Sequence, residues 1–111
     1  MSEKTVRWIG SVLDDLRIFP DEARRRAGHE LHRVQMGDEP ADWKPMPSIG
    51  IGAREIRIHT GREHRVFYVA RFDDAVYVLH AFEKKTRATR KADIDLAKQR
   101  YRSMIQGRQR R

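Results

Sequence analysis

Three consecutive runs in the second half of the sequence have the period of two that is typical of β-strands. They are AREIRIHT (53–60), HRVFYVARF (64–72) and AVYVLHAF (75–82), and turn signals at Gly61 and at Asp73-Asp74 separate them. Such short separations join neighbouring strands in antiparallel order. The sequence therefore predicts an antiparallel three-stranded meander at the centre of the fold.

Helical periods lie on both sides of this meander. Before it, the residues after Ser11 predict a short helix that stops near Pro20. A second helix follows, with apolar residues at helical spacing in Ala23, Ala27, Leu31 and Val34. After the meander, a C-terminal helix is indicated by Ile94, Ala97, Tyr101 and Met104.

The remaining segments complete a predicted α+β fold. The run KTVRWIG (4–10) predicts a short first strand, whereas residues 38–52, with three of the four prolines, predict a loop. The expected order is β-α-α-β-β-β-α, an antiparallel sheet with an N-terminal helical hairpin and a C-terminal helix.

Length and composition predict one small cytoplasmic domain. A chain of 111 residues suits a single core, so we expect residues 1–111 to form one domain, with 106–111 as a frayed basic tail. The absence of cysteine excludes disulfides and thiolate metal sites and fits a reducing compartment. No stretch has the character of a signal peptide or a membrane span, so no membrane partner is expected.

The net charge of +8 is concentrated near the end of the sequence. Residues 84–111 contain 11 Lys and Arg against two Asp, whereas residues 1–83 are close to neutral. A helix dipole accounts for only a few cations in the last turn. The surplus favours a polyanionic partner, either nucleic acid or an acidic protein.

One face of the predicted sheet collects groups that can bind a phosphodiester. The period of two places Glu55, Arg57 and His59 together, opposite Ile56 and Ile58. The next strands extend this face, and the enlarged set includes Arg65, Arg71, His80, Phe82, Lys84 and Lys85. Its cations can hold phosphate, and an aromatic ring such as Phe82 can stack a splayed base.

These groups suit cleavage of single-stranded RNA by its own 2′-hydroxyl. That reaction needs a proton acceptor, cations to stabilise charge at phosphorus, and a proton donor for the departing 5′-oxygen, but neither a metal nor a cofactor. Candidates for proton transfer are Glu55, His59 and His80. Candidates for charge stabilisation are Arg57, Arg65, Lys84 and Lys85.

Plainer interpretations of the same residues stay open. Arginine and glutamate alternating with isoleucine is also the pattern of an ordinary solvated sheet face. Lys84 and Lys85, at the end of a strand, can serve only to block edge pairing.

Four motifs, taken as a set, are specific. They are E-I-R in the first strand of the meander, R-V-F-Y in the second, V-L-H-A-F-E-K-K-T-x-x-T from the third, and D-x-x-x-A-x-x-R-Y in the final helix. With them, residues 44–104 resemble the phage-derived HigB-like branch of the RelE/ParE toxin superfamily. The two preceding helices occur where that fold has its helical hairpin.

The resemblance implies the toxin of a type II toxin-antitoxin pair, usually a ribosome-dependent mRNA endoribonuclease (mRNA interferase) that inhibits translation. Its partners would be the ribosome with mRNA, a helix-turn-helix antitoxin, and operator DNA only through that antitoxin. We predict catalytic roles for Glu55, Arg57, Arg65, His80 and Lys84. We predict RNA-binding roles for Arg71, Phe82, Lys85, Arg87, Arg90 and Lys91.

Two other functions fit the same sequence. Some branches of the superfamily poison DNA gyrase, so a non-enzymatic, ParE-like gyrase inhibitor is one alternative. A basic nucleic-acid-binding accessory protein without toxicity is the other, because the charge distribution alone accounts for it.

Overall fold

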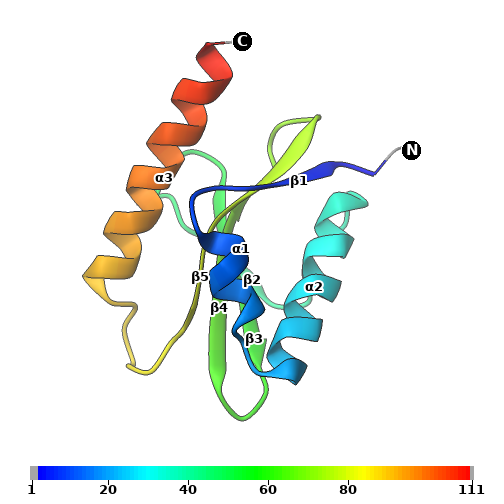
Figure 1. The fold of residues 1–111 in the computed structure, drawn as a ribbon, viewed down its shortest axis with the longest axis vertical. Coiled ribbons are helices and arrows are strands. Elements are labelled where there is room, and N and C mark those ends of the chain that lie inside the picture. The colour runs from blue at the N-terminus through cyan, green and yellow to red at the C-terminus, as the bar shows by residue number, and fades with distance from the viewer. Residues whose placement is uncertain (1–2, 111) are drawn as a thin grey trace.

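The structure, a computed structural model, describes residues 3–110, and in these it has a five-stranded sheet and three helices (Figure 1). In chain order the elements are β1 (Thr5–Trp8), α1 (Val12–Arg17), α2 (Asp21–Gln35), β2 (Trp43–Pro45), β3 (Ala53–His59), β4 (Glu63–Val69), β5 (Ala75–Glu83) and α3 (Lys91–Gln109). The order of strands across the sheet is β1-β5-β4-β3-β2. The predicted α+β class is confirmed.

The predicted meander forms β3, β4 and β5. These strands pair in antiparallel order, and Arg57 lies directly opposite Arg65. The β4–β5 ladder is irregular between Phe67 and Tyr68, where Leu79 has no partner in the register. A bulge of this kind changes the alternation of side chains along β5.

The predicted strand order and pairing need two corrections. Residues 38–52 are not only a loop, because β2 lies within them and pairs with β3. Three residues are too few to show a period, and Pro45 is tolerated because β2 is an edge strand. The sheet is also mixed, because β1 pairs with β5 in parallel. Between β1 and β5 the chain passes through α1, α2 and the three antiparallel strands β2, β3 and β4, so this parallel pair joins elements far apart in the sequence.

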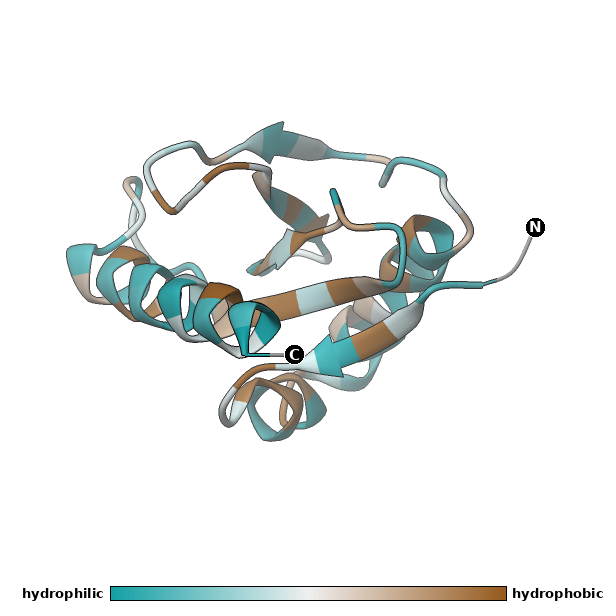
Figure 2. Ribbon diagram, turned by 90° about the horizontal axis from the view of Figure 1, so that it is seen from above, coloured by the Kyte–Doolittle hydropathy of each residue, from teal (hydrophilic) through white to brown (hydrophobic). Residues whose placement is uncertain are grey.

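Both faces of the sheet are covered. On one face α1 and α2 pack over Ile56, Ile58, Val66, Tyr68 and Val78, and on the other α3 packs over Phe67, Val69, Tyr77, Leu79 and Phe82. In Figure 2 the hydrophilic colour dominates the turns of α3, while the apolar colour is strong on the central strands. Loop residues Met46 and Ile49 complete the second layer.

The predicted basic tail, residues 106–111, begins within α3. Residues 106–109 are helical, and Arg108 donates to the Asp74 carboxylate at 3.0 Å and to the Tyr77 hydroxyl at 2.8 Å. Its guanidinium also lies 3.8 Å from the centre of the Phe72 ring. These contacts fix the last turns against the β4–β5 hairpin; residue 111 of the predicted tail lies outside the described residues. No helix between residues 3 and 110 is long and apolar enough to cross a bilayer.

Candidate nucleic-acid interface

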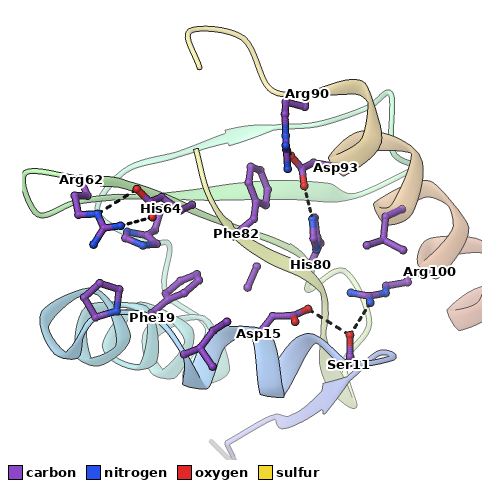
Figure 3. A pocket seen from close by; sticks show the side chains of 15 residues that line it. Ser11, Asp15, Phe19, Arg62, His64, His80, Phe82, Arg90, Asp93 and Arg100 are labelled. Atoms are coloured by element: carbon purple, nitrogen blue, oxygen red, sulfur yellow. Dashed lines mark hydrogen bonds and ion pairs between the residues drawn. The ribbon is translucent and has the colours of Figure 1, made fainter. Parts of the chain in front are cut away.

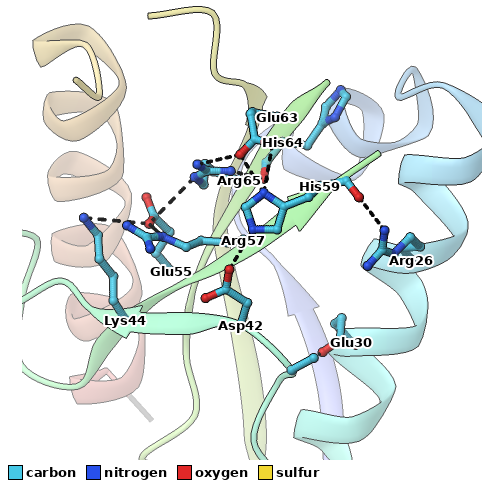
Figure 4. Close-up of polar contacts among 11 residues, drawn as sticks. Arg26, Glu30, Asp42, Lys44, Glu55, Arg57, His59, Glu63, His64 and Arg65 are labelled. Carbon is cyan, nitrogen blue, oxygen red and sulfur yellow. Dashed lines mark hydrogen bonds and ion pairs between the residues drawn. The ribbon is translucent and has the colours of Figure 1, made fainter. Parts of the chain in front are cut away.

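Two arginines lie side by side around a buried carboxylate (Figure 4). Arg57 and Arg65 are register partners, a position in which like charges repel. Glu55 Oε1 is 3.2 Å from Nε of Arg57 and 3.8 Å from Nε of Arg65, and Lys44 Nζ lies 4.0 Å from the same oxygen. Glu55 is only 1% exposed, so its carboxylate is shielded from solvent. Its negative charge offsets the repulsion between the two guanidiniums and positions the cations around it.

The charges continue toward the β3–β4 turn. Arg65 donates from Nη2 to Glu63 Oε1 at 3.0 Å. The His59 ring lies between two carboxylates, with Nδ1 2.7 Å from Glu63 and Nε2 2.7 Å from Asp42. The result is a row of alternating charges across three strands and the loop before β2. We call it the charged row, and it comprises Asp42, Lys44, Glu55, Arg57, His59, Glu63 and Arg65.

Exposure separates the groups that can touch a ligand from those that position them. The side chains of Lys44 and Arg57 are 45% and 34% exposed, whereas Arg65 is 6% exposed. His59 and Glu63 are also accessible to solvent, at 48% and 41%. A phosphate group can therefore contact Lys44 and Arg57 directly. The buried Glu55 cannot exchange a proton with a bound substrate.

The two carboxylates shift the pKa of His59. Its hydrogen bonds to Asp42 and then to Glu63 raise the pKa of the imidazole above its ordinary value. In return, the bond to His59 lowers the pKa of Glu63. At neutral pH the imidazole thus keeps its second proton more readily than a free histidine does.

The basic segment 84–91 follows β5 and begins beside the charged row. The Lys84 amide donates to the Glu63 carbonyl at 2.7 Å, while Lys84 Nζ donates to the Arg87 carbonyl at 2.8 Å. Lys85 and Arg87 are exposed. The side chain of Lys84 therefore stabilises the bend of the segment, and its neighbours present cations to solvent.

The chain matches one family model, described as phage derived protein Gp49-like (DUF891), over residues 14–102. This range covers most of the chain and includes the whole charged row and segment 84–91. The chain belongs to this family. Gp49-like proteins are RelE-like toxins of toxin-antitoxin systems. A comparison with curated proteins gave no match.

The Gp49-like chain holds His80 in a buried contact with α3 (Figure 3). Its Nε2 is 2.8 Å from Asp93 Oδ1, and Arg90 Nε is 3.3 Å from the other oxygen of that carboxylate. The ring of His80 stacks on Phe82 at 4.9 Å, and its Nδ1 is buried and has no hydrogen-bond partner within residues 3–110. This geometry joins the start of α3 to β5 and leaves His80 little access to a substrate.

The predicted site residues thus differ in where they lie. Glu55, Arg57 and Arg65 are together as predicted, and the backbone of Lys84 begins segment 84–91 next to them. The side chain of Lys84 bonds the Arg87 carbonyl, and Arg90 and Lys91 pair with Asp93 and Asp95 of α3. Phe82 is 9% exposed with its ring against Phe67, which does not agree with base stacking by Phe82. Arg71 lies past the far end of β4, against the Phe72 ring and the Ile51 carbonyl, so it is not part of the site.

The charged row of this Gp49-like protein includes three residues outside the predicted site: Asp42, Lys44 and Glu63. The period of two in the strand places Glu63 on the face of Arg65, and that signal could have found it. Asp42 and Lys44 lie in the segment that the sequence predicts as a loop, so no strand period marked them.

Proposed function

We propose that the chain is the toxin of a type II toxin-antitoxin system, of the HigB-like branch, and that it cleaves mRNA on the ribosome. The observation that carries the proposal is the pair Arg57 and Arg65, fixed by Glu55 and continuous with the basic segment 84–91 in a Gp49-like chain. Paired guanidiniums suit the charge that develops on a phosphodiester under attack by a 2′-hydroxyl.

Exposure favours a division of labour among the site residues. Arg57 contacts the phosphate. The buried Arg65 adds positive charge next to Arg57, and Glu55 positions both arginines. Glu63, not the buried Glu55, is the carboxylate that a 2′-hydroxyl can reach. His59, whose pKa is raised, is the donor for the departing 5′-oxygen.

The cleavage that we propose needs neither a metal nor a cofactor. The 2′-oxygen attacks phosphorus and gives its proton to Glu63, the bond from phosphorus to the 5′-oxygen breaks, and that oxygen takes a proton from His59. The products carry a 2′,3′-cyclic phosphate and a 5′-hydroxyl. A helix-turn-helix antitoxin neutralises the protein in the cytoplasm, and operator DNA is bound only through that antitoxin.

Induction in cells, with messenger 5′ ends mapped before and after, tests the proposal. We expect growth arrest, new 5′-hydroxyl ends within coding regions, and loss of both in Arg57→Ala. Arg54→Ala is the matched control, because Arg54 lies on the same strand with a similarly exposed side chain and contacts the Trp43 ring instead.

The alternatives give different results in the same cells. Intact messages together with arrested supercoiling would support inhibition of gyrase instead of mRNA cleavage. Intact messages with normal growth would leave only nucleic-acid binding.

A further inference from the structure

The main chain around Asp42, just before β2, is fixed by hydrogen bonds to two other elements (Figure 4). The Ala41 amide donates to Glu30 Oε2 of α2 at 2.7 Å. The Asp42 carbonyl accepts from the Arg57 amide of β3 at 2.9 Å. Because these bonds lie on both sides of the Asp42 side chain, the fold sets the position from which its carboxylate acts.

The imidazole of His59 is held at both of its ring nitrogens. Nε2 lies 2.7 Å from Asp42 Oδ2, and Nδ1 lies 2.7 Å from Glu63 Oε1 and 2.8 Å from Oε2 of the same carboxylate. The main chain of His59 is fixed as well, because Arg26 of α2 donates to its carbonyl. His59 can therefore give a proton to a substrate only if one of the two carboxylates releases the ring.

The two carboxylates differ in what else they contact. Glu63 Oε1 also accepts from Nη2 of Arg65 at 3.0 Å, so the Nδ1 side of the ring faces the paired arginines. Asp42 holds the other ring nitrogen, from the stretch that is bonded to α2 and β3. A phosphodiester that binds the arginines approaches Nδ1, and Glu63 is the carboxylate that it separates from the ring.

Separation of Glu63 from the ring changes the electrostatics of His59. In the free chain both carboxylates raise the pKa of the imidazole, and the hydrogen bond to Asp42 is the larger cause. Once Glu63 turns to the 2′-hydroxyl, Asp42 is the carboxylate that stays on the ring and keeps it protonated.

The charged groups that face His59 come from four parts of the fold. They are Asp42 from the segment before β2, Glu63 and Arg65 from β4, Arg57 from β3 itself, and Arg26 from α2. Three of the five are cations, which favour the neutral ring. The charge of Asp42 therefore opposes them at the moment when the ring must still hold its proton.

We propose that Asp42 is a positioning residue for the cleavage, and that it holds Nε2 of His59 so that the proton reaches the 5′-oxygen from Nδ1. The reaction that His59 serves rests on the proposed function; the contact between Asp42 and the ring does not. As the 2′-oxygen bonds to phosphorus, its proton passes to Glu63. The bond from phosphorus to the 5′-oxygen breaks, and its electron pair takes the Nδ1 proton. The ring is left neutral, with its remaining proton on Nε2 and donated to Asp42.

Titration of the free chain by nuclear magnetic resonance tests the contact without any cleavage. In Asp42→Asn, which keeps an acceptor but loses the charge, we expect His59 to titrate at least about half a pH unit lower than in the parent. In the parent above this pKa, the neutral ring should carry its proton on Nε2. Asp38→Asn is the matched control, because Asp38 is an exposed aspartate of the same segment, and it should leave the titration of His59 as it is. Equal titration of His59 in the two variants overturns the proposal, as does a neutral ring with its proton on Nδ1.

The pH profile of cleavage tests the role of Asp42 in the reaction. With a ribosome-bound message, the rate of the parent should fall at alkaline pH as His59 loses its proton, and in Asp42→Asn the midpoint of that fall should lie at least about half a pH unit lower. Asp42→Ala also removes the acceptor for Nε2, so it should be at least about tenfold slower at every pH, because the ring loses its orientation. Asp38→Asn should follow the parent. A residue with only a structural role would lower the rate without moving the midpoint.

The two experiments keep this inference distinct from the proposed function. Absence of cleavage by the parent argues against the proposed function and against the reaction that Asp42 serves, while the titration still shows whether Asp42 holds the ring. Cleavage with a pH midpoint that Asp42→Asn does not move overturns the role of Asp42 and leaves the endoribonuclease activity in place.

Discussion

At the scale of single residues, the buried carboxylate of Glu55 is the centre of the site. It holds Arg57 and Arg65 side by side, although strand pairing alone would make them repel. Sequence periodicity was sufficient to predict that these three residues share a face. It could not predict that Glu55 is buried, because that depends on how the neighbouring strands β2 and β4 pack on either side of it.

Glu55→Gln should destabilise the fold. The change leaves the cations around Glu55 without their counter-charge, so we expect a loss of roughly 2–4 kcal/mol in the free energy of unfolding. Urea denaturation measures it. Glu39→Gln is the control, because Glu39 is exposed and its pairing with Arg54 at 4.0 Å is long, and it should cost under about 0.5 kcal/mol. Equal effects would show that Glu55 does not hold the cluster.

His59 should make stability depend on pH in a defined direction. Its pKa is raised in the folded state, so its contribution is complete below the unfolded value of about 6.5 and is lost as pH rises through the folded pKa. The stability difference between the parent and His59→Gln should therefore be larger at pH 6 than at pH 9. His29→Gln, on the exposed side of α2, is the control; a difference that grows with pH contradicts the assignment.

At the scale of elements, the regular strands were predictable and the irregular ones were not. β3, β4 and β5 show alternation over seven to nine residues. The turn between β3 and β4 has a φ of 88° at Gly61, a backbone conformation that glycine adopts without strain. β2 is too short for a period. The bulge at Leu79 places Tyr77 and His80 on one face despite their odd spacing, and α3 then covers His80.

The contact between His80 and Asp93 should anchor the start of α3. Asp93→Asn removes the charge from a buried hydrogen bond and should cost about 1.5–3 kcal/mol, with faster amide exchange in the first turns of α3. Asp95→Asn is the control, because Asp95 pairs with Lys91 at the surface, and should cost under about 0.5 kcal/mol. If both variants are equally stable, the buried contact does not fix the helix.

At the scale of the whole molecule, the structure shows where the excess of Lys and Arg lies. The surplus of Lys and Arg in residues 84–111 begins beside the charged row and continues along α3. The sequence predicted this concentration from composition alone. It did not predict that part of the surplus is used internally. Arg100 and Arg108 contact other elements, and Arg90 pairs with Asp93 in the first turn of α3.

Removal of two exposed cations should weaken RNA binding without affecting the fold. For the double variant Lys85→Ala with Arg87→Ala, the slope of log affinity against log salt concentration should fall by about 1.4, since each phosphate contact on a single strand contributes about 0.7. Arg7→Ala with Arg25→Ala, at exposed positions on β1 and α2, should leave the slope unchanged. An equal fall in both would indicate attraction by net charge alone.

The most direct test of the central claim is cleavage of a ribosome-bound message in which the nucleotide at the mapped cleavage position is either ribose or 2′-deoxyribose. With ribose, we predict one cut that leaves a 2′,3′-cyclic phosphate and a 5′-hydroxyl and is at least 100-fold slower with Arg57→Ala. With 2′-deoxyribose we predict no cut at that position. Cleavage of the deoxy message at the same rate would contradict the account.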